Sequence, residues 1–294
     1  MSLFRVFPVA ALLVGCKSFV APLDALREEG RSAPPDVELY ASVLAEHVDP
    51  AGTVDYAALQ SDADELERFY AQIAAVSPHS HPDSFTSEAD RLAYWLNAYN
   101  AATLVSVTRL YPIESVEDLG PPWYLFFAPD TAGFFYARTQ EFGGERWSLY
   151  DLEHQVVRGG FGDARIHFAL NCASAGCPVL PREPFRADAL DAQLEREATK
   201  FFAEPRNLEI DHEARLVRLS SILDWFAEDF LDDLTELGVE DPTVLEYAAR
   251  YAPEPTAAAL RGPAADYAVE YVPYDWRLNG RGLERYPVPE LIDG

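Results

Sequence analysis

The residues best suited to chemistry are two cysteines and two histidines in the middle of the chain. Cys172 and Cys177 occupy the small-residue run NCASAGC, and His154 and His167 precede it. A cysteine nucleophile needs an imidazole nearby to hold it as the thiolate, and usually a third group to orient that ring. These residue types favour Cys172 as a nucleophile and His154 as its base. The acids that could orient the imidazole are Asp151, Glu153 and Asp275.

The same cysteines allow two other arrangements. A C-x4-C pair across a turn has suitable geometry for a disulfide, and an oxidising compartment favours it, so a Cys172–Cys177 bond is a strong alternative to a catalytic thiol. A zinc site built from His154, His167, Cys172 and Cys177 ranks last, because this spacing matches no common ligand pattern.

Other catalytic and cofactor motifs are missing from the sequence. The Gly-Gly pairs at 143–144 and 159–160 lack the context of a phosphate loop or a dinucleotide site, and no H-E-x-x-H run occurs. Ser174 lacks the G-x-S-x-G surroundings of a serine hydrolase nucleophile. We therefore expect neither a cofactor nor a metal.

The segment that leads into the cysteines must aim them. Large apolar residues alternate with other residues over 165–170, which predicts a strand, and the small residues before Pro178 predict a tight turn. Free backbone N–H groups in such a turn could stabilise an oxyanion. In a regular strand His167 and Cys172 would face opposite sides, so the turn would have to redirect the thiol.

Two of the helices predicted before this segment carry candidate site residues. One, over 149–158, begins after a capping serine and carries Arg158. The other, over 87–110, is apolar on most sides and should be central; its polar exceptions, Asn97 and Asn100, lie on one face. These amides either brace nearby loops or orient a site, and the pattern favours neither role.

The remaining patterns predict an α/β fold, with α+β as the alternative. We expect a small central sheet, mixed or antiparallel, with helices packed around it. No linker or internal repeat follows residue 35, so residues 36–294 should form a single globular domain. The pairing of His154 with Cys172 suggests an architecture of the papain or transglutaminase type with a permuted order.

The N-terminus resembles the signal of a bacterial lipoprotein. A short apolar run ends in LVGC (13–16), which resembles the lipobox, where cleavage leaves an acylated cysteine. We expect a signal peptide over 1–15, lipidation of Cys16 and a flexible tether over 16–35. The run is too short to span a bilayer, so acyl chains would be the anchor, and Lys17 resembles the outer-membrane sorting type.

The charge of the chain excludes one class of partner. The net charge is -26, from 23 basic and 49 acidic residues, and the acidic residues are spread along the sequence. Binding to phosphate backbones needs a basic surface, so we expect no nucleic-acid partner. The expected partners are the membrane, through the lipid anchor, and an envelope peptide or protein.

Five blocks of sequence, in this order, resemble the bacterial domain-of-unknown-function family DUF547. They are YWLNAYNAATL (94–104), SLYDLEHQVVR (148–158), RIHFALNCASAGCP (165–178), LSSILDWFAEDF (219–230) and YDWRLN (274–279). The resemblance covers roughly residues 36–280 and implies an exported or lipid-anchored α/β domain with no established reaction. The family's typical polar positions map onto Asn97, Asn100, Glu153, His154, Arg158, His167, Cys172, Ser174, Cys177, Asp275 and Asn279.

The resemblance has one local departure and one functional implication. The central block reads Asn171-Cys172-Ala173 where many relatives would have Val-Cys-Gly, so the glycine expected in a tight turn is replaced. Polar residues define the family's blocks, and this favours a functional site, because apolar residues would suffice if the blocks served only to pack the core.

Our leading hypothesis is an envelope enzyme. It would be a lipid-anchored, periplasmic, cysteine-dependent amide hydrolase or acyl transferase acting on envelope peptides, with Cys172 as nucleophile, His154 as base, and Asp275 or Glu153 as the orienting acid. Residues expected to line the site are Asn97, Asn100, Arg158, His167, Ser174 and Asn279. The alternative is a non-catalytic lipoprotein with a Cys172–Cys177 disulfide, whose polar cleft binds a ligand or a protein partner.

Overall fold

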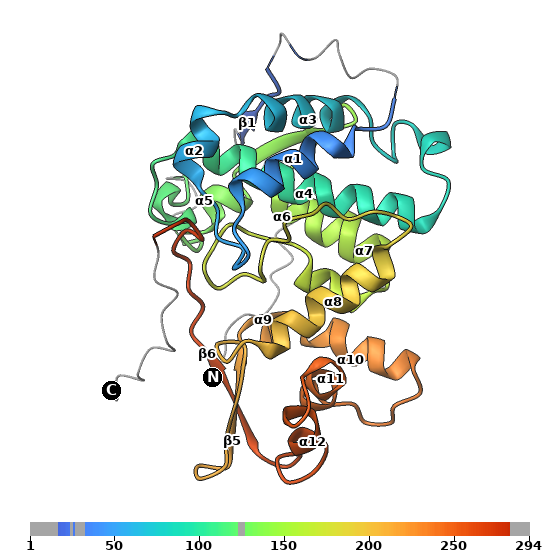
Figure 1. Ribbon diagram of the computed structural model, residues 1–294, viewed down its shortest axis with the longest axis vertical. Helices are drawn as coiled ribbons and strands as arrows, with labels where there is room; N and C mark the ends of the chain where they lie inside the picture. The colour runs from blue at the N-terminus through green and yellow to red at the C-terminus, as the bar shows by residue number, and fades with distance from the viewer. Residues whose placement is uncertain (1–16, 24–25, 27–32, 123–126, 283–294) are drawn as a thin grey trace.

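The computed structural model describes residues 17–23, 26, 33–122 and 127–282 (Figure 1). The expected signal peptide over 1–15 and the lipidation residue Cys16 lie outside the described residues. The mixture of helices and small mixed sheets confirms the expected α/β class, but the described residues form two separate three-stranded sheets where one central sheet was expected. Among the described helices, none combines the length and the hydropathy that a bilayer crossing requires.

Helices make up most of the regular structure. In chain order they are α1 (Val37–His47), α2 (Tyr56–Ser61), α3 (Asp64–Ala75), η2 (Pro82–Ser84), α4 (Glu88–Leu110), η3 (Val116–Leu119), α5 (Ala132–Phe135), α6 (Leu149–Asp151), η5 (Leu152–Val157), α7 (Arg158–Gly160), η6 (Ala164–Phe168), α8 (Leu190–Ala203), α9 (Ile222–Trp225), α10 (Ala227–Glu236), α11 (Val244–Tyr251) and α12 (Thr256–Arg261). α6, η5 and α7 follow one another without a break, and η5 is a π-helical stretch within them.

The long helix α4 lies at the centre, as its apolar sequence predicts. The Ser87 hydroxyl accepts a hydrogen bond from the Asp90 N–H, and the Asp90 carboxylate accepts one from the Ser87 N–H, so a capping box begins the helix. Every residue from 92 to 108 is buried. Pro112, just after its end, cannot continue the helix.

The strands form two small mixed sheets. In the first, β1 (Ser18–Val20) runs parallel to β2 (Arg138–Phe142), which pairs antiparallel with β3 (Glu145–Trp147). In the second, β5 (Leu216–Ser220) pairs antiparallel with β4 (Leu208–Asp211) and parallel with β6 (Ala268–Val272). The second sheet lies at the end of the molecule that carries α11 and α12, away from α1 and α3 (Figure 1).

Strand β1 corrects the expectation of a flexible tether over the whole of 16–35. Val20 is buried, and its carbonyl accepts a hydrogen bond from the Tyr70 hydroxyl at 2.6 Å. The Lys17 ammonium lies 2.9 Å from the Asp151 carboxylate. Pairing with β2 satisfies the backbone groups of this segment, and burial of Val20 adds hydrophobic stabilisation, so the chain is already part of the body at residue 17.

The core consists of two hydrophobic clusters that meet at the segment before the cysteines. One cluster gathers around α1, α3 and α4, and the other around α8, β5, α10 and α11. Ile166, Ala169 and Leu170 belong to the first cluster, whereas Ala164 and Phe168 belong to the second. This short segment therefore holds the two halves of the molecule together.

The strand predicted over 165–170 is wrong. Residues Ala164–Phe168 form the 3-10 helix η6, and the Asp163 carboxylate caps it by accepting a hydrogen bond from the Arg165 N–H at 3.0 Å. His167 is as buried as its apolar neighbours, because both clusters surround the segment. An alternating pattern indicates a strand only where one side faces water, and here neither side does.

Candidate functional site

Buried amides hold the segment before the cysteines against α4. The Asn100 side chain donates to the Ala169 carbonyl at 2.9 Å and accepts from the Asn171 N–H at 2.8 Å. The Asn171 side chain donates to the Pro178 carbonyl at 2.8 Å and accepts from the Ala173 N–H at 2.9 Å. Of the two roles considered for Asn100, the structure shows bracing.

The same bracing accounts for two further predicted site residues. Asn97, on α4, donates to the Phe185 carbonyl at 2.8 Å and accepts from the Phe185 N–H at 2.9 Å. Asn279 accepts from the Tyr56 hydroxyl at 2.7 Å and donates to the Asn171 side chain at 3.3 Å. Each amide satisfies backbone or side-chain groups that would otherwise be buried without partners.

The turn after Cys172 is tight although it has no glycine at the position expected. Ala173 adopts φ +63° and is completely buried. The left-handed region costs a non-glycine residue about 1–2 kcal/mol, and it persists only where the surroundings enforce it. Two hydrogen bonds hold this conformation in place. The Asn171 side chain accepts from the Ala173 N–H, and the Asn279 N–H donates to the Ala173 carbonyl, both at 2.9 Å.

Cys172 and Cys177 form a disulfide across this turn, with their Cα atoms 6.1 Å apart. The Tyr274 hydroxyl lies 3.2 Å from the Cys172 sulfur and 3.3 Å from the Cys177 sulfur. The Ser174 hydroxyl lies 2.9 Å from the Cys172 sulfur. Cys172 is half-buried and Cys177 is buried. Disulfide sulfurs are not thiolates, so the zinc arrangement is wrong and the free nucleophile is not the state shown.

The turn does not offer the expected set of free N–H groups. The N–H of Cys172 points to the Cys177 sulfur at 2.7 Å, and the N–H of Ala175 donates to the Arg277 carbonyl at 2.6 Å. The N–H groups of Gly176 and Cys177 donate to carbonyls 2.8 and 3.1 Å away. An oxyanion hole needs donors that have no internal partner, and these four donors have partners.

A second group of charged residues lies on the helices beside the turn. Asp229, on α10, accepts two hydrogen bonds from the Arg158 guanidinium, both at 2.7 Å, and lies 2.6 Å from His167 Nε2. Burial acts to raise the pKa of Asp229, but the hydrogen bonds from Arg158 and His167 outweigh it and hold that pKa well below the usual range. Asp229 is therefore a carboxylate, and His167 Nε2 carries the proton between them.

His154 does not take the place expected of a catalytic base. Its Nδ1 lies 3.0 Å from the Tyr150 carbonyl and its ring stacks on the Tyr150 ring at 3.9 Å. Within the described residues no hydrogen bond joins His154 to either sulfur, which corrects the expected pair with Cys172. Burial and the nearby Arg158 lower the pKa of His154 to about 4, so the ring is neutral at physiological pH.

Glu153 and Asp275 do not orient His154 either. Glu153 accepts a hydrogen bond from the Tyr99 hydroxyl at 3.3 Å, and burial raises its pKa to about 7. Asp275 pairs with Arg277, accepting a hydrogen bond from its Nε at 2.9 Å. The π-helical stretch η5 carries Glu153 and His154, and such stretches are frequent at functional sites.

Aromatic rings connect and border these two groups. The Phe226 ring stacks on His167 at 3.9 Å and lies 6.3 Å from His154. On the side of the disulfide, Trp225 and Trp276 pack against the Tyr274 ring at 4.8 and 4.4 Å. Half-buried aromatic rings beside charged groups are typical of surfaces that bind ligands.

Three residues of this region were not among the predicted site residues. Asp229 and Tyr274 each lie within a block that resembles the family, and Tyr99 lies on the long helix. No local pattern marks them, because each meets its partner only through the tertiary fold. The polar residues in the blocks at 219–230 and 274–279 were the signal in the sequence that could have pointed to Asp229 and Tyr274.

Comparison with known proteins gives one match. Residues 82–202 match the model of DUF547, a family described as a protein of unknown function. No curated protein and no solved structure matches the chain. The matched segment includes α4, the helices that carry Glu153 and His154, and the cysteine turn, while the blocks at 219–230 and 274–279 lie beyond it. The likeness to DUF547 therefore covers residues 82–202, which is less than half of the chain.

Proposed function

We propose that the protein is a lipid-anchored envelope protein that binds a ligand or a protein partner, with Cys172 and Cys177 joined in a structural disulfide. The observation that carries the proposal is the engagement of the predicted catalytic groups in internal contacts. The sulfurs are bonded to each other, His154 faces Tyr150, and Asp275 faces Arg277. The bordering aromatic rings supply the kind of surface that a binding protein uses.

Peptide mapping under non-reducing conditions tests this proposal. Trypsin would release residues 166–182 as one peptide that contains both cysteines and no internal cleavage site. We expect this peptide to resist alkylation before reduction and to take up two labels after it. Alkylation of Cys172 without prior reduction would overturn the structural disulfide.

The lipid anchor needs a separate test, because Cys16 lies outside the described residues. In a bacterial host, incorporation of labelled fatty acid and recovery in the membrane fraction should both depend on Cys16. A Cys16→Ser variant is expected to lose the label and to enter the soluble fraction. Membrane recovery of this variant together with retained labelling would contradict the anchor.

A second candidate function is a cysteine-dependent amide hydrolase or acyl transferase that acts on envelope peptides after reduction. The observation in its favour is the unequal exposure of the pair, since Cys172 is half-buried and Cys177 is buried. A dithiol reductant would free the Cys172 thiol beside the Tyr274 hydroxyl. Its thiolate would add to the amide carbonyl, the amine would leave with a proton, and water would hydrolyse the thioester.

The variant Cys177→Ser separates the two candidates, because it leaves Cys172 free without any reductant. An enzyme would then cleave peptide amides in the absence of reductant, and Cys172→Ser would be inactive. In an enzyme, the rate at which iodoacetamide labels Cys172 would also begin to rise at a pH well below 8.5, which is the ordinary pKa of a thiol. A binding protein would show no cleavage in either variant and an ordinary labelling profile.

A further inference from the structure

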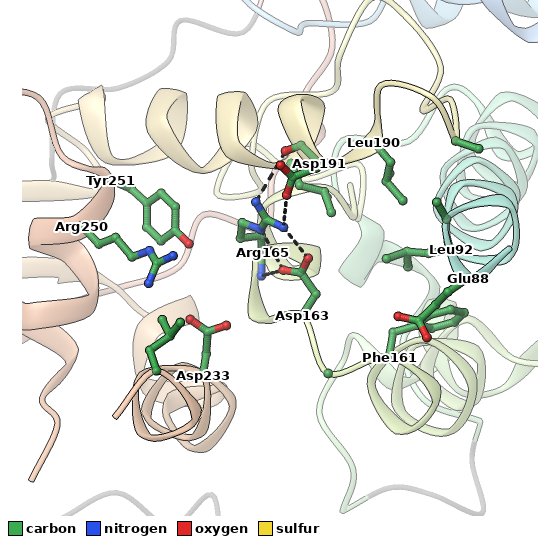
Figure 2. A pocket seen from close by; sticks show the side chains of 15 residues that line it. Glu88, Leu92, Phe161, Asp163, Arg165, Leu190, Asp191, Asp233, Arg250 and Tyr251 are labelled. Carbon is green, nitrogen blue, oxygen red and sulfur yellow. Dashed lines mark hydrogen bonds and ion pairs between the residues drawn. The ribbon is translucent and has the colours of Figure 1, made fainter. Parts of the chain in front are cut away.

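A cavity of ≈ 540 Å³ opens at the junction of the two hydrophobic clusters, away from the disulfide turn (Figure 2). The first turns of α4 and of α8 form one side of it, and the ends of α10 and α11 form the other. Its volume lies in the range of pockets that hold small organic molecules. None of the residues predicted as site residues lines it.

One wall of this cavity is apolar. Leu92, Leu190 and Leu194 belong to the first hydrophobic cluster and line the cavity together with Phe161. These side chains are part of the packed core, so the wall is rigid and preformed. It would accept an apolar group of a ligand without rearrangement.

The floor of the cavity carries charges that are already paired. The Arg165 guanidinium bonds the Asp163 carboxylate at 2.7 and 2.9 Å and the Asp191 carboxylate at 2.8 Å (Figure 2). Its remaining nitrogen lies 3.5 Å from Glu195. This ion-pair network fixes the loop before η6 to α8, and it leaves Arg165 without a donor to spare for a ligand.

Asp233, on α10, lacks what Asp163 and Asp191 have. Its Oδ2 atom is buried and has no hydrogen-bond partner. Burial raises the pKa of this carboxyl, and the positive charges of Arg250 and Arg165 only partly oppose the rise. A buried acceptor without a donor costs about 1–3 kcal/mol, so an ordered ligand group that donates to Asp233 would bind favourably.

Arg250, at the end of α11, presents the opposite charge to the same cavity. The side chain is exposed, and among the described residues it forms no ion pair or hydrogen bond. Its guanidinium and the Asp233 carboxylate face the same space from different helices but do not meet (Figure 2). A ligand that carries both charges would satisfy the two side chains at once.

We propose that this cavity binds a small zwitterion, a free amino acid or short peptide with an apolar side chain. Its ammonium group would bind Asp233, its carboxylate would bind Arg250, and its side chain would lie on the wall formed by Leu92, Leu190 and Leu194. This inference goes beyond the proposed function, because the cavity is a separate site that the aromatic rings beside the disulfide do not line. A polyanion such as a nucleotide fits poorly, because it would leave Asp233 without a donor and would meet the exposed carboxylate of Glu88.

Calorimetric titration of the intact protein in detergent tests the site with matched probes. L-Leucine and L-leucyl-L-leucine carry both charges, L-leucinamide lacks the carboxylate, and 4-methylpentanoate lacks the ammonium group. We expect at least one zwitterion to bind, and each single-charge analogue to bind about 10-fold more weakly or worse, since a charged hydrogen bond contributes about 1.5–3 kcal/mol.

Two variants assign each charge to its residue. Asp233→Asn should abolish the preference for leucine over 4-methylpentanoate, and Arg250→Gln should abolish the preference for leucine over leucinamide. Asp232→Asn, an exposed neighbour that does not line the cavity, is the matched control and should bind like the parent protein. Each variant is judged by the ratio of its affinities for leucine and for one analogue. A general loss of folded protein would lower both affinities and leave that ratio unchanged.

The outcomes separate the site from the proposed function. Failure of both zwitterions to bind, or unchanged preferences in Asp233→Asn and Arg250→Gln, would overturn the site even if peptide mapping finds the disulfide intact. Binding with the expected preferences would support the site even if Cys172 proved to be a free thiol, in which case only the proposed function would fall.

Discussion

The cysteine turn and the cavity by Asp233 treat their polar groups in opposite ways. In the turn, the Asn100 and Asn171 side chains bind backbone groups, most backbone N–H groups have partners, and the Tyr274 hydroxyl lies against both sulfurs. In the cavity, Asp233 has a buried oxygen without a partner. Polar groups that complete one another stabilise the fold, whereas a buried group left incomplete reduces stability and is available to a ligand.

Residue types alone would place the functional site at the cysteine turn, and the contrast between the two regions argues against that. The chemically reactive residues of the sequence gather at the turn, yet their geometry is that of a brace between α4, the turn and the segment around Asn279. The cavity is lined by ordinary charged and apolar residues that no motif marks. Substitutions in the two regions should therefore differ in sign as well as in size.

The largest effect is expected for Asn100→Ala. The substitution leaves the Ala169 carbonyl and the Asn171 N–H buried without partners, and each unsatisfied group costs about 1–3 kcal/mol. We expect the free energy of unfolding to fall by about 4 kcal/mol, measured by urea denaturation. A loss below about 1 kcal/mol would show that the turn does not depend on this brace.

Glu153→Gln should change stability in a pH-dependent way. The pKa of this carboxyl is about 7 in the folded protein, raised by burial, and near its ordinary value when unfolded. The unfolded state therefore releases the proton first, so the stability of the parent protein falls as pH rises from about 4.5 to 7. At pH 8 the variant should be more stable by about 2–3 kcal/mol, and at pH 4 the difference should vanish.

The matching measurement is a series of urea denaturations between pH 4 and pH 8 for both proteins. Asp229 titrates in a separate, more acidic window, because its pKa is lowered, and it should not obscure the result. A constant difference between Glu153→Gln and the parent at every pH would contradict the raised pKa. It would point to packing rather than ionisation as the role of Glu153.

Removing both cysteines should have a smaller effect. The disulfide closes a loop of few residues, and short loops restrict the unfolded chain least, so the double variant Cys172→Ser/Cys177→Ser should lose about 2 kcal/mol. Reduction of the parent protein should lower its thermal midpoint by a comparable amount. If the double variant failed to fold, the disulfide would be the main support of the turn, and the amide brace would be secondary.

Local signals in the sequence mark the elements that local physics determines. The capping box at Ser87 and Asp90 marks the start of α4, and the Gly143-Gly144 pair marks the hairpin between β2 and β3. Both depend on residues a few positions apart. The same is true of the helix that begins at Ser148, although its π-helical stretch has no signature in the sequence.

The features that the sequence could not predict depend on distant contacts. The segment over 165–170 reads as a strand because both of its sides are buried, and burial on both sides is a property of the whole fold. Asp229 reaches His167 across 62 positions of chain. The choice between a free thiol and a disulfide at Cys172 depends on how the turn places Cys177, and both arrangements share one sequence.

The smallest effect, opposite in sign to the effects of the turn substitutions, is expected for Asp233→Asn. The substitution breaks no hydrogen bond of the buried Oδ2, because that atom has no partner. It also replaces a carboxyl group whose pKa is raised by burial with a neutral amide. We expect the free energy of unfolding at pH 7 to stay the same or to rise by up to about 1 kcal/mol, with a smaller gain at pH 4, where the parent carboxyl takes up its proton. Urea denaturation beside the Asp232→Asn control would measure this difference. A loss of stability of the size expected for Asn100→Ala would mean that Asp233 supports the fold as the turn residues do, and the distinction between a self-satisfied turn and an unsatisfied cavity would not hold.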